Sequence, residues 1–114
     1  MSNTIKFPWP PKELSPNARV HWAVKAAKVK LYRSHYYYLT KQSGIKVNDN
    51  PIELFITFNP PDKRKRDMDN CLASIKSGLD GLAEALKVND RNFVLHLKMS
   101  DSFDGSVDIA IKDY

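Results

Sequence analysis

The sequence is poor in cysteine and has no long apolar run. Among its 114 residues there is one cysteine, Cys71, so an intrachain disulfide is excluded and no cysteine pair is available to hold zinc. No apolar stretch approaches the roughly 20 residues that cross a bilayer, and the N-terminus shows no apolar signal-peptide segment. We therefore expect a cytoplasmic protein that does not insert into membranes, with Cys71 as a small buried residue on a helix.

The sequence also lacks the motifs of several kinds of active site. The histidines are widely spaced and form no HExxH pair, which argues against a zinc hydrolase. No nucleophile elbow is present, so Ser/His/Asp catalysis has no support. An EF-hand that began at Asp67 would place Leu72 and Gly78 where that loop needs its glycine and its bidentate glutamate.

Positive charge is present in excess and is unevenly distributed. The formal net charge is +5. Residues 1–50 carry nine Lys or Arg against two acids, residues 51–66 carry four against two, and residues 67–114 carry five against nine. The excess therefore lies in the N-terminal half and in the run from Lys63 to Arg66. This distribution favours a polyanionic partner, but charge alone leaves nucleic acid and an anionic membrane both open.

The apolar pattern predicts one compact domain of the α+β class. A chain of this length forms a single core, so residues 1–114 are expected to fold as one domain. Alternating segments predict strands, and apolar residues at helical spacing predict helices. In chain order we expect strand 5–7, helix 19–40, strand 52–58, helix 69–86, and strands 93–99 and 107–112. Turn residues at 48–51 precede the second strand, and the last two strands should form a hairpin in one mixed sheet with two main helices.

The helix expected over residues 19–40 combines apolar and basic side chains. Its apolar stripe consists of Trp22, Ala26, Val29, Tyr36 and Leu39. The other face carries Lys25, Lys28 and Arg33, which we expect to contact a polyanion. The aromatic rings of residues 36–38 either pack in the core or stack against a ligand.

The most informative segment joins four basic residues to a pair of acids. Lys63, Arg64, Lys65 and Arg66 run directly into Asp67-Met68-Asp69-Asn70. Basic side chains favour phosphate, whereas clustered carboxylates repel phosphate and hold a hard divalent cation. A protein that needs both within a few residues is expected to bring a phosphodiester to a metal. The alternative is a solvated charge run that precedes an ordinary helix cap.

A third acid and a lysine extend this candidate site. Asp67 and Asp69 can point the same way from an extended segment, and Asp90 can join them if the chain folds back after the second helix. Such carboxylates favour Mg²⁺, with Mn²⁺ also possible. Lys76 lies two turns after Asp69 on one predicted helix, so it could approach a phosphate at the metal. The alternative for Lys76 is a pair with Asp80 along the helix.

Three segments carry a resemblance to a known family. They are residues 5–11 with their strand and Pro-rich turn, residues 64–70 with basic residues before Asp-Met-Asp-Asn, and residues 79–82 together with 88–90. The chain resembles the RusA family of Holliday junction endodeoxyribonucleases over almost its full length. These are small, homodimeric, Mg²⁺-dependent enzymes that are often carried by phages and prophages.

The resemblance implies roles for individual residues. It makes Asp67, Asp69 and Asp90 the metal-binding carboxylates and Lys76 the catalytic lysine. One departure is that the best-known family pattern has lysine where this chain has Ala73. Another is that Asn89 stands where a second acid is often found.

From this resemblance and these residues we expect the function to be Mg²⁺-dependent resolution of four-way DNA junctions in recombination and repair. Paired symmetric nicks would be made by a homodimer in the cytoplasm of a bacterial or phage-infected cell. Lys63, Arg64, Lys65 and Arg66 would grip backbone phosphates, together with Lys25, Lys28 and Arg33. Two alternatives are a noncatalytic protein that binds branched DNA and a less selective branch or flap nuclease.

Overall fold

The computed structural model describes residues 3–48 and 51–113. The expected turn at residues 48–51 includes Asp49 and Asn50, which lie outside the described residues. The elements in chain order are β1 (Thr4–Pro8), η1 (Lys12–Leu14), α1 (Trp22–Ser43), β2 (Ile52–Asn59), α2 (Met68–Ser74), α3 (Lys76–Leu86), η2 (Asp90–Asn92), β3 (Phe93–Met99) and β4 (Ser106–Asp113). Among the described residues, no helix combines the length and apolar character that crossing a membrane requires.

The sheet is mixed and its strand order is β1-β4-β2-β3. β4 pairs antiparallel with both β1 and β2, whereas β2 and β3 are parallel. Parallel neighbours require a crossover, and the segment that contains α2 and α3 provides it. The fold class is therefore α+β with one mixed sheet, as the sequence predicts.

The predicted hairpin of β3 and β4 is wrong, because β2 lies between these two strands. The segment after β3 crosses the end of β2 instead. The Ser100 amide donates to the Phe58 carbonyl, and the Ser100 hydroxyl donates to the Asn59 side-chain oxygen. Alternation along a strand reports which face is buried, but it does not report which strand is the neighbour.

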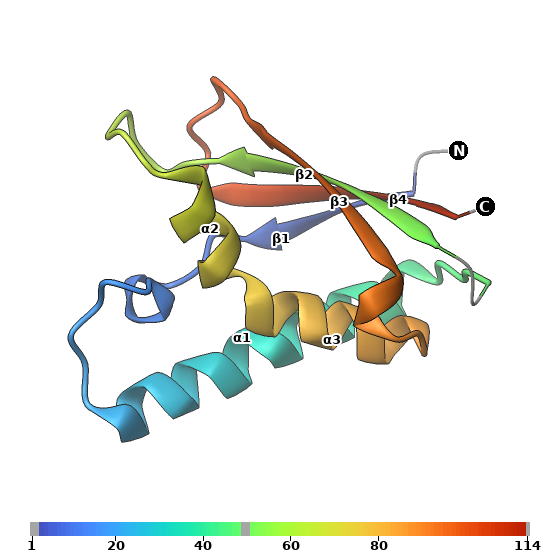
Figure 1. Cartoon of the computed structure of the whole chain (residues 1–114), viewed down its shortest axis with the longest axis horizontal. Coiled ribbons are helices and arrows are strands. Elements are labelled where there is room, and N and C mark those ends of the chain that lie inside the picture. Colours follow the sequence, from blue (N-terminus) through green and yellow to red (C-terminus); the bar gives the residue numbers. More distant parts are fainter. Residues whose placement is uncertain (1–2, 49–50, 114) are drawn as a thin grey trace.

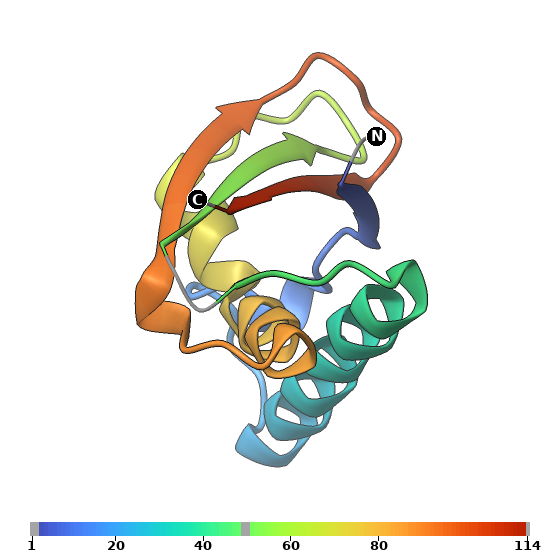
Figure 2. The same ribbon diagram turned by 90° about the vertical axis from the view of Figure 1, so that its right-hand side faces the viewer.

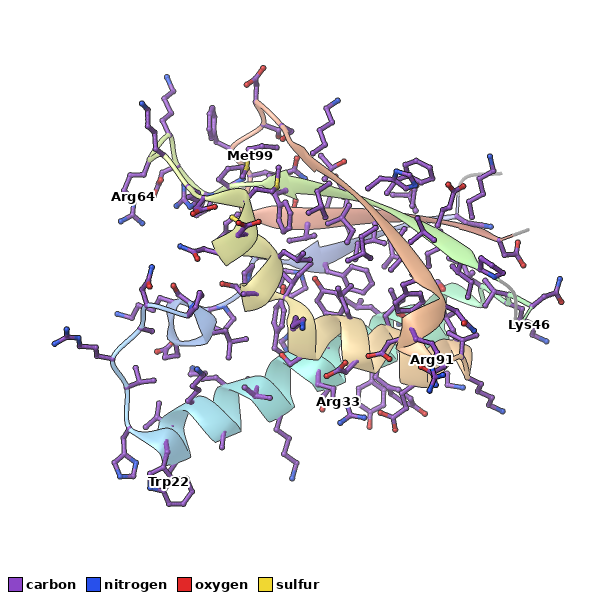
Figure 3. The ribbon with its side chains drawn as sticks, viewed as in Figure 1. Trp22, Arg33, Lys46, Arg64, Arg91 and Met99 are labelled. Atoms are coloured by element: carbon purple, nitrogen blue, oxygen red, sulfur yellow. The ribbon has the colours of Figure 1, made fainter. Side chains whose placement is uncertain are left out.

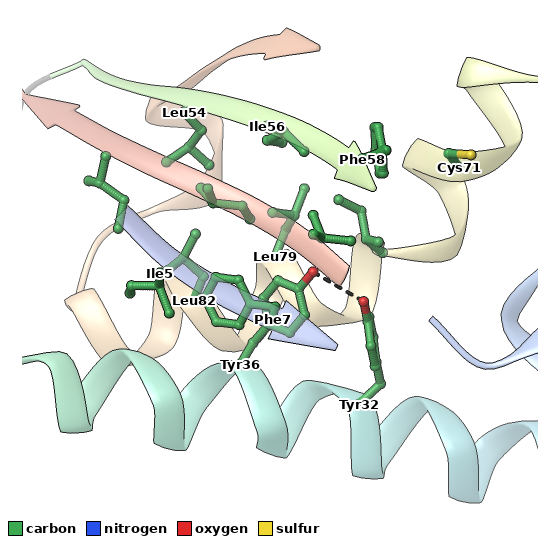
Figure 4. Packing of buried hydrophobic residues seen from close by; sticks show 14 of the residues in the cluster. Ile5, Phe7, Tyr32, Tyr36, Leu54, Ile56, Phe58, Cys71, Leu79 and Leu82 are labelled. Carbon is green, nitrogen blue, oxygen red and sulfur yellow. Dashed lines mark hydrogen bonds between the residues drawn. The ribbon is translucent and has the colours of Figure 1, made fainter. Parts of the chain in front are cut away.

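The helices cover one face of the sheet, which leaves the other face without a helical layer (Figures 1 and 2). The covered face of β2 buries Ile52, Leu54, Ile56 and Phe58, the alternation that the sequence predicts. β4 contributes alternate apolar residues to the same core. The Phe7 ring of β1 stacks on Tyr36 of α1 with ring centroids 3.9 Å apart (Figure 4). The core thus joins the sheet to α1.

The predicted helix 69–86 is two helices. Ile75, with φ −101° and ψ 4°, separates α2 from α3, and the two axes differ clearly in direction (Figure 1). The Ser74 hydroxyl donates to the Asn70 carbonyl, a contact that often bends helices, and the Ile75 amide donates to the Leu72 carbonyl. Because Ile75 is fully buried, the bend is held by the core. Lys76 is therefore not on a continuous helix with Asp69, and the predicted shared face is wrong.

The first helix is displaced from its predicted bounds and from part of its predicted stripe. α1 begins at Trp22, after His21, whose ring Nδ1 accepts a hydrogen bond from the Ala23 amide. Tyr32, Tyr36 and Thr40 are the buried residues of the helix. Trp22, which was expected in the apolar stripe, is 76% exposed.

Candidate nucleic-acid interface and acidic residues

Asp62 organises the loop that carries the basic run. Its Oδ1 accepts hydrogen bonds from the Arg64 amide at 3.0 Å and Arg64 Nε at 3.3 Å, and lies 2.9 Å from a guanidinium nitrogen of Arg66. The Arg66 guanidinium, and then the Arg64 amide, lower the pKa of Asp62 to about 2. The carboxylate is therefore ionised at neutral pH, and its contacts with Arg64 and Arg66 stabilise the shape of the loop.

The basic residues of the run differ in their surroundings. The Arg66 side chain is only 15% exposed, donates to the carbonyls of Asp62 and Arg64, and lies over the Trp9 ring at 5.5 Å. The Arg64 side chain is 80% exposed and extends from the loop (Figure 3). Lys63 and Lys65 are also exposed. Arg66 thus supports the loop, whereas the other three cations face solvent.

A groove of about 460 Å³ lies between this loop and the segment that follows β1. Its cationic wall consists of Lys12, Arg64, Lys65 and Arg66. Asp67 and Asn70 of the α2 region, and Trp9 of the segment after β1, also line it. The groove therefore presents several cations beside one carboxylate.

The first two predicted carboxylates lie at the beginning of α2. Asp67 is the N-cap, and its Oδ1 accepts a hydrogen bond from the Asp69 amide at 3.0 Å. Both aspartates are exposed. The short extended segment before α2 therefore keeps them together, and one oxygen of Asp67 serves the helix cap.

Cys71 lies in the wall of the same groove and is buried, as predicted. Burial raises the pKa of its thiol, with the Arg66 charge acting in the opposite direction. The thiol therefore stays protonated at neutral pH, which agrees with a packing role.

Asp90 and Lys76 share a different hollow. Its volume is about 270 Å³, and its lining includes Lys76, Asp80, Asp90 and Arg91. α3 contributes the first two of these residues and η2 the last two. The structure thus brings the predicted lysine to the third predicted acid, together with Asp80, the alternative partner of Lys76.

Within residues 3–48 and 51–113, no three acidic, histidine or cysteine side chains lie close enough to hold one metal ion. Asp67, Asp69 and Asp90 belong to this part of the chain, so one chain does not gather them into the expected site. Figure 3 shows the separation through labelled neighbours, because Arg91 lies near the far end of α3 from the loop that carries Arg64.

The three predicted cations of α1 occupy different environments. Lys25 is exposed, and Lys28 is half-buried beside a small hollow with Trp9 and Tyr32. Arg33 donates to a Glu84 oxygen at 2.7 Å. Lys25 and Lys28 are therefore less engaged by the protein than Arg33 is.

Lys12, Asp62 and Trp9 are the residues of this region that were not predicted from the sequence. The signal for Asp62 is its spacing, since an acid four residues before Arg66 can pair with it across a turn. No local pattern links Trp9 to Arg66, because their contact joins segments far apart in the sequence.

A comparison with known proteins identifies one relative. A protein of Xylella fastidiosa, described as uncharacterized, is 40% identical over 102 residues, which cover 86% of this chain and 67% of the relative. The chain belongs to the family of this protein. No protein-family model matches the sequence. Membership of this family carries no stated activity, so the resemblance to RusA enzymes stays a prediction.

Proposed function

We propose that the chain is a Mg²⁺-dependent endodeoxyribonuclease of the RusA kind that acts on four-way DNA junctions. The observation that carries the proposal is the groove in which Lys12, Arg64 and Lys65 lie beside Asp67. Cations of this kind bind backbone phosphates without reading sequence, which suits a protein that selects a branched shape. Asp67 and its neighbour Asp69 supply the oxygen ligands that Mg²⁺ or Mn²⁺ prefers.

The four cations of the basic run would have different roles in binding phosphate. Lys63, Arg64 and Lys65 are the exposed members of the run, so they would make the phosphate contacts. Arg66 would act indirectly, since its hydrogen bonds to the carbonyls of Asp62 and Arg64 fix the shape of the loop.

The separation of the acids limits how the proposed site can be completed. Asp67 and Asp69 lie at the beginning of α2, whereas Asp90 lies with Lys76 beyond the bend at Ile75. If all four residues act on one phosphodiester, either a second copy of the chain or a rearrangement on DNA must unite them. The proposed homodimer would supply the second copy, and its two-fold symmetry suits paired nicks in a four-way junction.

A noncatalytic protein that binds branched DNA is the second candidate. It is favoured by the positions of Lys76 and Asp90, which line a different hollow from the groove that Asp67 lines. A less selective branch nuclease would have the same cations and acids, and only its range of substrates separates it from a junction resolvase.

The test is cleavage of a labelled four-way junction in added Mg²⁺ by the parent and by Asp69→Asn. Asparagine keeps the shape and much of the helix-forming behaviour of aspartate but removes a negative ligand. We expect the parent to make paired nicks, and the variant to lose cleavage by several orders of magnitude while its thermal stability is unchanged. Junction affinity without metal should hold or rise, because one negative charge near phosphate has gone.

A matched control is Asp101→Asn, which removes the same charge on the other side of the basic run. This variant should cut at the parental rate. If Asp69→Asn also cuts at the parental rate, the assignment of Asp69 is wrong. If the parent binds junctions and never cuts them, the noncatalytic candidate replaces the nuclease, and cutting of simple flaps at an equal rate favours the broader nuclease.

A further inference from the structure

The first part of α1 is not packed against the rest of the domain. Residues 19–27 are all exposed, although they include the first six residues of the helix. Figure 3 shows Trp22 at the free end of α1, directed away from the sheet. Trp22 is 76% exposed and Val24 is 47% exposed, so this end of the helix offers large apolar side chains to solvent.

The same segment is rich in positive charge and lacks acids. Residues 14–48 contain seven Lys or Arg and no Asp or Glu. Arg19 and Lys25 flank Trp22 and are exposed, as is His21, whose ring lies 5.6 Å from the Trp22 ring. An aromatic ring among unopposed cations matches a partner that carries flat rings and negative charge together.

Two other partners fit these side chains less well. A second copy of the same segment would bring cations against cations, which opposes self-association. A membrane surface would need one continuous apolar stripe, but Trp22 and Val24 are two residues apart and point to different sides of the helix. Val24, Leu31 and Tyr38 recur every seven residues and form an exposed apolar stripe on one side of α1, but Trp22 lies on the opposite side and is not part of it.

We propose that Trp22 is a stacking site for an unpaired base of single-stranded or branched DNA, with Arg19 and Lys25 at the flanking phosphates. Bases stack on exposed aromatic rings with little regard to sequence, and cations beside the ring follow the backbone. Trp22 and Arg64 lie at the same end of the long axis of the molecule (Figure 3), so one DNA molecule could contact both. This inference deepens the proposed function and rests on it for the biological substrate.

The test measures binding of a fluorescein-labelled oligo-dT strand and of a duplex of equal length, in EDTA so that no cleavage occurs. The variants are Trp22→Ala, Trp22→Phe, which keeps a ring, and Val24→Ala, which removes an exposed apolar group of the same helix end. Trp22→Ala should lower affinity for the single strand by about 5- to 150-fold, which corresponds to ~1–3 kcal/mol for one stacked base.

The controls separate stacking from charge and from folding. Trp22→Phe should retain most of the affinity, Val24→Ala should stay close to the parent, and circular dichroism should be the same for all. Duplex affinity should barely change in Trp22→Ala. The salt dependence of single-strand binding should also be unchanged by Trp22→Ala, whereas Lys25→Ala should flatten it, because only the lysine releases counterions from phosphate.

Several results would overturn the stacking role. Unchanged single-strand affinity in Trp22→Ala is one, and equal losses for single strand and duplex is another. If Trp22→Ala instead dissociates an oligomer in sedimentation, or loses binding to anionic vesicles while DNA binding persists, the surface serves a second copy or a lipid headgroup. Cleavage tests the proposed nuclease separately, because a parent that cuts junctions while Trp22→Ala binds and cuts normally refutes only the stacking site.

Discussion

The two halves of α1 have similar residues but different surroundings. Residues 22–27 are exposed on every side, whereas Tyr32, Tyr36 and Thr40 in the second half are buried. Both halves contain aromatic and basic side chains, so composition does not distinguish them. The difference arises from α3, which packs against the second half and presents its small residues there.

Two glycines of α3 make this close approach possible. A Cβ on Gly78 would lie 2.6 Å from Cε1 of Tyr36, and a Cβ on Gly81 would clash with the Arg33 carbonyl oxygen. The first half of α1 extends beyond the beginning of α3 (Figure 1). Packing of a helix is therefore decided by its neighbour as much as by its own residues, and the half without a neighbour stays available to a ligand.

The largest expected effect comes from Gly81→Ala, which should disrupt the packing of the second half of α1 against α3. The added methyl group meets backbone rather than a mobile side chain, so α1 and α3 must separate. Forced overpacking of this kind costs about 3 kcal/mol or more. The melting temperature should fall by roughly 10 °C or more, as measured by circular dichroism.

Gly44→Ala provides the matched control for Gly81→Ala. Gly44 has open space around it, but its φ of 72° is in the left-handed region. The expected cost is therefore only about 1 kcal/mol, from backbone strain alone. Equal losses in the two variants would mean that close helix packing does not determine the position of α1.

Local patterns in the sequence predict the elements but not their partners. The alternation of β2 and β4 and the buried position of Cys71 follow from residue types that are neighbours in the chain. The bend at Ile75 depends on the fit of that side chain into the core, and the position of β2 between β3 and β4 depends on the whole sheet. Sequence spacing therefore overstated the proximity of Lys76 to Asp69.

The candidate site was predictable to the same extent. Residues adjacent in sequence, such as Asp67 and Asp69, do lie together at one end of α2. Asp90 required a long-range return of the chain, and within one chain that return brings it to Lys76 and Asp80. The support of Arg66 by Trp9 is likewise a contact between distant segments, which no spacing rule contains.

An intermediate effect is expected from the buried tyrosine pair. The Tyr32 hydroxyl donates to the Pro8 carbonyl at 2.8 Å, so the Tyr36 hydroxyl must be the donor in the 3.1 Å bond between the two. Tyr32→Phe leaves both the Pro8 carbonyl and the Tyr36 hydroxyl without a partner, at about 1–3 kcal/mol. Tyr36→Phe removes only a donor and should cost about 1 kcal/mol.

Chemical denaturation at neutral pH gives the order of the two variants, and an equal or reversed order would contradict this donor assignment. Burial also raises the pKa of both hydroxyls above the ordinary value of 10.0. The folded state therefore favours the un-ionised form, and stability should be complete below pH 10 and decline as the pH rises further. Each Phe variant should show a shallower alkaline decline, because it has one fewer buried hydroxyl to ionise.

The smallest effect is expected from Glu84→Gln, at the point where the exposed half of α1 meets the packed half. The Arg33 and Glu84 side chains are 50% and 55% exposed, so their 2.7 Å ion pair is screened by water. Its loss should lower stability by at most ~1 kcal/mol, with a smaller difference at high salt. The same change frees the Arg33 charge, so metal-free affinity for DNA should rise slightly and its salt dependence should steepen. Denaturation and salt-dependent anisotropy measure the two effects. A large loss of stability would mean that the ion pair is a principal contact between α1 and α3. An unchanged DNA affinity would remove Arg33 from the proposed interface. Lys25 and Lys28 would then remain as the predicted phosphate contacts of this helix.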